Sequence, residues 1–196
     1  MVESGRQASN RRKVYVIGNG MTRFMRPGKH SFDYHDLSKV AIQRALRDAA
    51  VSYKEVEIAY CGYVIGDATA GQRAVYTVGL SGIPIINVNN NCSTGSTALY
   101  QCYQTIATSQ AECALALGFE KMSRGSLVAN FADRANPMDE FILLNNDMHG
   151  TAKGPLMPQL FGNAGREHME KYGSKPHHFA KIAEKNHRHS ANNPYS

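Results

Sequence analysis

One cysteine stands in a stretch whose residue types suit nucleophilic chemistry. In NVNNNCSTGSTAL, residues 87–99, Cys92 follows a run of asparagines and precedes small, mostly hydroxylated residues. An apolar run comes before this stretch and a helical pattern follows it, so the cysteine falls at a predicted strand-to-helix turn. Free backbone N–H groups and the positive end of a helix dipole stabilise a thiolate at such a place. Cys92 is therefore a candidate nucleophile, and its small neighbours would let an electrophile approach.

Inert packing is the alternative role for any cysteine, because cysteine is among the residues most often buried. Cys61, Cys102 and Cys113 lie within apolar periodic segments, and we expect them to be buried and unreactive. For Cys92 the residues alone leave both roles open. The four cysteines are unevenly spaced, form no CxxC pair and follow no secretory leader, which favours a reduced compartment.

The asparagines that precede the cysteine are expected to have a structural role. Side-chain amides bond readily to free backbone groups in turns. We therefore expect Asn87, Asn89, Asn90 and Asn91 to hold the turn around Cys92 rigidly.

The segments that would position Cys92 alternate between strand and helix patterns. Short apolar runs predict strands at 14–20, 57–66, 83–89 and 113–120, and apolar residues at three- and four-residue steps predict helices at 35–50, 72–80 and 92–109. This alternation predicts an α/β fold, a parallel sheet covered by helices. Ligands bind beyond the carboxyl ends of the strands in such sheets, and Cys92 would lie there.

After Met122 the alternation of strands and helices stops. Glycines, prolines, asparagines and histidines become frequent, and the remaining pattern predicts helices at 161–173 and 176–193. The chain stops at NNPYS without a further packing layer, and on this ground we expect a truncated protein. His177 and His178 are adjacent and His187 and His189 are two apart, so each pair would point to different helix faces. No metal site is expected, and these histidines should lie at the surface.

Composition sets broad limits on the function. The 196 residues are 42% hydrophobic, which is enough for a globular core. The net charge of +6 suits an anionic partner such as nucleic acid, anionic lipid or a phosphorylated small molecule, and does not choose among them. No apolar stretch approaches the roughly 20 residues that cross a bilayer, so we expect a soluble protein without a transmembrane segment.

Several stretches together resemble the thiolase family, most closely its sterol carrier protein x type. They are NVNNNCSTGSTALYQC, ALALGFEKMSRGSL, CGYVIGDATAGQRAVYTVGLSGIPIINVNNNC and QLFGNAGREHMEKYG. The resemblance runs from about Lys13 to Ser196. It implies a layered βαβαβαβ half-domain at 13–122 and a partial, mainly helical loop domain at 123–196, and the polar residues 1–12 before them are expected to form a flexible tail. The second half of the thiolase fold is expected to lie outside this chain.

The resemblance also implies an activity, that of a 3-ketoacyl-CoA thiolase or acyl-CoA C-acyltransferase. The cysteine matching Cys92 would form an acyl-enzyme, with CoA as cosubstrate and no metal or redox cofactor. The activating histidine and a second, acid and base cysteine would come from the second half. Phe161 and Gly162 match the family's Met-Gly position and would line the substrate channel, with packing at a helix start as the alternative. Substrates would include branched-chain and sterol side-chain acyl groups in peroxisomal β-oxidation, within lipid metabolism and lipid transport.

Partners and location follow from the same resemblance. We expect acyl-CoA and CoA rather than nucleic acid as ligands, and a homodimer in the full-length form. The full-length family is peroxisomal, whereas a cytoplasmic location is the alternative for this chain because it shows no peroxisomal signal. The rival function is a truncated, non-catalytic isoform or fragment that binds acyl-CoA or lipid, or another subunit. A condensing enzyme that shares the same cysteine turn is a third possibility.

Overall fold

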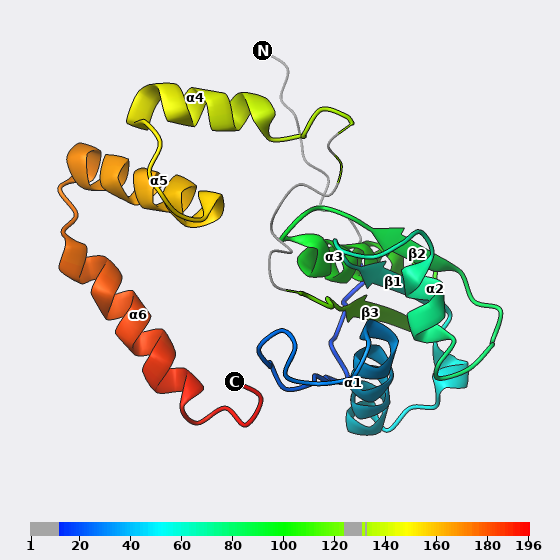
Figure 1. Ribbon diagram of the computed structural model, residues 1–196. Helices are drawn as coiled ribbons and strands as arrows, with labels where there is room; N and C mark the ends of the chain where they lie inside the picture. The colour runs from blue at the N-terminus through cyan, green and yellow to red at the C-terminus, as the bar shows by residue number, and fades with distance from the viewer. Residues whose placement is uncertain (1–11, 124–130, 132) are drawn as a thin grey trace, which may run out of the picture. The chain divides into compact units, whose positions relative to one another are not determined.

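The computed structural model describes residues 12–123, 131 and 133–196. The chain divides into two compact units, residues 1–126 with Tyr195 and residues 127–194 with Ser196, and each is described by itself. Among the described residues, a parallel sheet with its covering helices makes up the first unit, and helices make up the second (Figure 1).

The described part of the first unit contains a three-stranded parallel sheet. Its strands are β1 (Ile58–Gly62), β2 (Ile85–Val88) and β3 (Ala114–Gly118), in the order β2-β1-β3. In the register, Tyr60 of β1 lies between Ile86 of β2 and Ala116 of β3. The predicted parallel α/β arrangement is confirmed, and the strands predicted at 57–66, 83–89 and 113–120 are present with shorter bounds.

Helices cover both faces of this sheet, and the alternation along β1 explains how. Ala59 and Cys61 point to one face, where they pack with α1 (Tyr34–Ala49) and α2 (Ala70–Val75). Tyr60 points to the other face and packs with α3 (Thr94–Ala107). Successive side chains of a strand alternate between faces, so one short strand anchors both layers. Figure 1 shows α1 and α3 on opposite sides of the sheet.

The helix predicted at 35–50 is confirmed as α1, and its start has a clear local cause. The Asp33 side chain accepts a hydrogen bond from the Tyr34 N–H at 2.7 Å. The Asp36 side chain accepts one from the Asp33 N–H at 3.0 Å, which completes a capping box. These carboxylates satisfy amides that have no partner within the helix and also favour its positive end. A short 3-10 helix (Tyr53–Glu55) follows before β1.

The strand predicted at 14–20 is wrong. These residues form no strand, and the side chains of Tyr15, Val16 and Ile17 are exposed. The segment instead lies against α1 at two glycines. An added Cβ atom would lie 2.4 Å from the Ala45 carbonyl oxygen at Gly18 and 2.1 Å from the Ala41 carbonyl oxygen at Gly20. Contacts with a helix, rather than a ladder with a neighbouring strand, hold this segment.

Two helices of the first unit differ in their bounds from the prediction. The helix predicted at 72–80 is α2, which begins earlier and ends at Val75, before β-branched Thr77 and Val78 and a glycine of low helix propensity. The helix predicted at 92–109 begins at Thr94. Asn91 adopts a left-handed φ of 46°, so the chain turns there before the helix can start.

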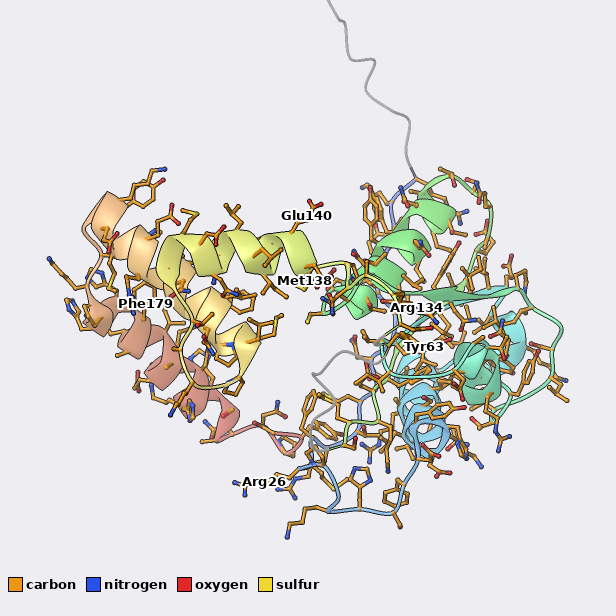
Figure 2. All side chains as sticks on the ribbon, turned by 45° about the horizontal axis from the view of Figure 1, so that its top comes forward. Arg26, Tyr63, Arg134, Met138, Glu140 and Phe179 are labelled. Atoms are coloured by element: carbon orange, nitrogen blue, oxygen red, sulfur yellow. The ribbon has the colours of Figure 1, made fainter. Side chains whose placement is uncertain are left out.

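The second unit contains α4 (Asp139–His149), α5 (Leu156–Tyr172) and α6 (Pro176–Ser190). The helices predicted at 161–173 and 176–193 correspond to α5 and α6. The sequence did not predict α4, because Asn145 and Asn146 are typical of turns rather than helices. The Phe179 ring of α6, labelled in Figure 2, lies close to α5, where a Cβ atom on Gly165 would be 3.8 Å from it.

No helix in the described ranges is both long enough and apolar enough to span a bilayer.

Candidate active site

Cys92 lies between the end of β2 and the start of α3. The helix begins at Thr94, with Ser93 as its N-cap residue, and the Cys92 side chain is exposed. The thiol therefore stands one residue before the helix cap, close to the first-turn amides and to the positive end of the helix dipole. The predicted strand-to-helix position of Cys92 is confirmed.

Hydrogen bonds hold the turn at residues 89–94, which we call the cysteine turn. The Thr94 hydroxyl accepts from the Asn90 N–H at 2.9 Å and donates to the Asn91 carbonyl. The Ser93 hydroxyl donates to the Asn90 carbonyl at 2.8 Å, and the Asn90 side-chain amide donates to the Thr97 hydroxyl at 3.0 Å. Thr94 itself is only 4% exposed. The turn is thus fixed from both sides of Cys92.

Asn87 stabilises the same region from one step further away. Its side-chain oxygen accepts from the Gly71 N–H at 3.1 Å, and its side-chain nitrogen donates to the Gln72 side chain at 2.7 Å. Gln72 in turn donates to the Ile85 carbonyl at 3.1 Å. These bonds join α2 to β2. Together with the contacts of Asn90, they agree with the prediction that the asparagines position the turn.

The ends of the other two strands lie against the first turn of α3. A Cβ atom added to Gly62, at the end of β1, would lie 2.6 Å from the Thr94 methyl group and 2.8 Å from its carbonyl oxygen. A Cβ atom on Gly118, at the end of β3, would lie 3.7 Å from the Gly95 Cα atom. The carboxyl ends of the strands therefore meet beside the cysteine turn, as expected for a ligand site in a parallel sheet.

The environment of the four thiols separates Cys92 from the others. Cys61 and Cys102 are buried, and burial raises the pKa of each thiol to about 12. Cys113 is partly exposed, and burial also raises its pKa. At neutral pH these thiols stay protonated, so they are poor nucleophiles. Their predicted packing role is confirmed for Cys61 and Cys102, whereas Cys113 is less buried than expected.

The contacts of Cys92 define what this part of the site can do. In the ranges that the structure describes, the thiol makes one polar contact, with the Asn91 side-chain oxygen at 3.8 Å. An exposed thiol beside a helix N-terminus can attack an electrophilic carbon such as a ketone or a thioester carbonyl. The described contacts supply no histidine or carboxylate to it as a general base.

Phe161 and Gly162 lie on α5 in the second unit, whereas Cys92 lies in the first. The Phe161 side chain is 76% exposed, and nothing in the described structure lies within 4 Å of a Cβ atom placed on Gly162. Their role in binding substrate remains a prediction. The histidines at 177, 178, 187 and 189 are exposed, as expected. Within the described residues, no three His, Cys, Asp or Glu side chains gather closely enough to hold a metal ion.

Sequence reasoning missed Gly62 and Thr94 as parts of the site. The signal for Thr94 was its place in the first turn after Cys92, where a short hydroxyl can bond back to the turn. The signal for Gly62 was a glycine at the end of a predicted strand, which permits a close approach of another element. Neither signal shows that Gly62 and Thr94 contact each other, because 32 positions separate them in the chain.

Comparison with known proteins agrees with this arrangement. The family model described as "Thiolase, N-terminal domain" matches residues 14–196. Sterol carrier protein 2 of Gallus gallus is 56% identical over 193 residues, which cover 98% of this chain and 35% of that protein. Non-specific lipid-transfer protein-like 2 of Caenorhabditis elegans is 47% identical over 188 residues, covering 94% of this chain and 46% of that protein. The chain thus spans about a third to a half of the length of these relatives.

A solved structure shows the same fold at low sequence identity. The Ltp2-ChsH2(DUF35) aldolase aligns over 92% of this chain and 44% of its own, with a TM-score of 0.66 and 18% identity. At that identity the likeness concerns the fold alone.

Proposed function

The chain belongs to the thiolase family, and we propose that it carries the nucleophilic part of a 3-ketoacyl-CoA thiolase, an acyl-CoA C-acyltransferase. The observation that carries this proposal is Cys92, an exposed thiol in a hydrogen-bonded turn at the amino end of α3. The other cysteines are more buried and have raised pKa values, so they are poor candidates for the same role.

In the proposed reaction, the Cys92 thiolate attacks the 3-keto carbon of a 3-ketoacyl-CoA. A carbon–sulfur bond forms, and the electron pair of the carbonyl moves to its oxygen. When the carbonyl reforms, the bond between C2 and C3 breaks and its electron pair stays on C2 of the departing acetyl-CoA, or propionyl-CoA from a 2-methyl-branched substrate, which takes up a proton, while the shortened acyl chain remains on the Cys92 sulfur. The thiol of a second CoA then attacks the thioester, takes the acyl group and returns the Cys92 sulfur to its starting state.

This chemistry makes two demands beyond the nucleophile. The oxyanion needs preorganised donors, and the Cys92 N–H is one that we propose. Proton transfer needs an acid and a base, which we assign to a part of the fold outside this chain, in line with the family resemblance. The cysteine turn contributes the orientation of the thiol, because its hydrogen bonds fix the backbone on both sides of the sulfur.

The substrate class is proposed from the family and from the chemistry of CoA. We infer medium to long 3-ketoacyl-CoA substrates, including branched-chain and sterol side-chain acyl groups, in peroxisomal β-oxidation. Relatives whose names refer to sterol carriage and lipid transfer support a role in lipid metabolism. The net charge of +6 suits the phosphates of CoA. Phe161 and Gly162 would line the acyl channel, and a homodimer would form in the full-length protein.

Formation of an acyl adduct on Cys92 tests this proposal directly. The chain, and the full-length polypeptide that contains it, would be incubated with a 3-ketoacyl-CoA and analysed by mass spectrometry of intact protein and peptides. We expect one acyl group on Cys92, released by added CoA in the full-length protein. Cys92→Ser should abolish the adduct, whereas Cys113→Ser should retain it, because Cys113 is the partly exposed thiol that serves as the matched control.

Two results would contradict the thiolase assignment. An adduct that persists in the full-length Cys92→Ser variant would place the nucleophile elsewhere. Binding of acyl-CoA with equal affinity in wild type and Cys92→Ser, with no adduct and no turnover in the full-length protein, would instead support a non-catalytic acyl-CoA-binding module.

A further inference from the structure

We propose that Glu120 is a positioning residue that holds the loop after β1 and thereby fixes the cysteine turn. This inference rests on the proposed function, because it concerns the reactivity of Cys92. Glu120 does not contact the thiol in the described structure. It acts through the backbone at the end of β1, which packs directly on the first turn of α3.

The Glu120 carboxylate binds two consecutive backbone amides. One oxygen accepts from the Val64 N–H at 3.0 Å and the other accepts from the Ile65 N–H at 2.9 Å. All three residues are partly buried. Hydrogen bonds to a charged acceptor are shorter and stronger than neutral ones, and two parallel bonds also fix orientation. Glu120 thus joins the end of β3 to a loop 55 residues earlier in the chain.

The neighbouring residue strengthens the same connection. The Phe119 N–H donates to the Gly62 carbonyl at 3.1 Å. The Phe119 ring stacks on the Tyr63 ring with centroids 5.0 Å apart and planes 13° apart, and on the Tyr34 ring at 5.2 Å. Figure 2 labels Tyr63 at the end of β1 in the first unit. Two successive residues after β3 therefore hold Gly62 to Ile65.

The held segment contacts the cysteine turn. Gly62 lies so close to Thr94 that an added Cβ atom would be 2.6 Å from the Thr94 methyl group. The Tyr63 N–H donates to the Val88 carbonyl, at the end of β2, at 3.4 Å. The Thr94 hydroxyl then bonds to the backbone of Asn90 and Asn91, immediately before Cys92. Displacement of the loop after β1 would thus be transmitted to the thiol through one packing contact and one hydrogen-bonded residue.

Alkylation of individual cysteines tests the inference on this chain without any substrate. The rate of iodoacetamide modification of each cysteine would be measured by peptide mass spectrometry, as a function of pH, in wild type and Glu120→Gln. Gln keeps the size of the side chain, but its NH₂ group must face one of the two amides and cannot accept from it. Glu112→Gln is the matched control, because Glu112 precedes β3 and is paired with Arg12.

We expect Glu120→Gln to slow alkylation of Cys92 about threefold near neutral pH, which is the size of one interaction between a charge and a helix terminus. The buried Cys61 and Cys102 should remain unmodified, and Glu112→Gln should leave Cys92 unchanged.

An unchanged Cys92 rate in Glu120→Gln, with Cys61 and Cys102 still protected, would overturn the positioning role. A changed rate that appears only together with modification of Cys61 and Cys102 would also overturn it, because general unfolding would then be the cause. The acyl-adduct experiment is independent of these rates, so the positioning role and the thiolase assignment can fail separately.

Discussion

Replacing Thr94 by valine should loosen the cysteine turn by a calculable amount. Valine has nearly the same shape, so the methyl group that packs on Gly62 remains while the hydroxyl is lost. The Asn91 carbonyl keeps a partner, because the backbone N–H of residue 94 still donates to it at 3.1 Å. The Asn90 N–H loses its acceptor. The change therefore removes two hydrogen bonds but leaves a single donor without a partner.

An unsatisfied donor costs about 1–3 kcal/mol, and the added apolar group returns about 0.8 kcal/mol. We therefore expect Thr94→Val to lower the free energy of unfolding of the first unit by about 0.2–2 kcal/mol. Because Cys61 is 0% exposed, its alkylation as urea increases reports unfolding of that unit specifically. At neutral pH without urea, alkylation of Cys92 should also change, since the Thr94 hydroxyl holds the backbone of Asn90 and Asn91 immediately before it.

Thr94→Ser is the matched control, because it keeps the hydroxyl and removes the methyl group. If the hydrogen bonds fix the turn, Thr94→Ser should leave the Cys92 alkylation rate close to that of wild type. The reasoning is refuted if Thr94→Val unfolds at the same urea concentration as wild type, or if Thr94→Ser perturbs Cys92 more than Thr94→Val does.

Two further predictions use the same reporter. Gly71→Ala would place a Cβ atom 2.1 Å from the Asn87 side-chain oxygen and should lower the free energy of unfolding by about 1–3 kcal/mol. Gly95→Ala is the control, because nothing lies within 4 Å of a Cβ atom placed there. Equal stability of the two variants would contradict the packing argument. At alkaline pH, the Cys61 thiol should affect stability, because burial raises its pKa from 9.0 to about 12 in the folded protein. Its contribution to the free energy of unfolding is complete below pH 9.0 and falls as the pH rises from 9.0 toward 12, by up to about 1.4 kcal/mol per pH unit. Cys61→Ala should show a shallower loss of stability above pH 9, and an identical slope would contradict this assignment.

Local periodicity accounts for the parts of the fold that the sequence predicted correctly. The apolar stripe and the capping aspartate of α1 are contained within a few turns of the chain, so they can be recognised without knowledge of any partner. The apolar runs that contain β1, β2 and β3 are likewise short, and each is recognisable from neighbouring residues alone. The same features located Cys92 between a strand and a helix.

Pairing between distant segments accounts for the errors. Residues 14–20 have the composition of a buried strand, yet two glycines bring them against α1 and leave Tyr15, Val16 and Ile17 exposed. A strand forms only when a neighbouring strand presents matching backbone groups, and that depends on the whole sheet. The α4 helix was missed for the opposite reason, because its asparagines are typical of turns although they lie inside a helix.

By itself, the sequence determined the class of fold, the place of the candidate nucleophile and the family resemblance. Each of these depends on patterns of residues that lie close together along the chain. Only the tertiary structure decided which thiol is exposed, which glycine permits α3 to approach β1 and which carboxylate holds the loop beside it. Burial and hydrogen bonding are properties of neighbours in space. Glu120 and Val64 are 56 residues apart in the chain, and only the parallel order of the strands places them together.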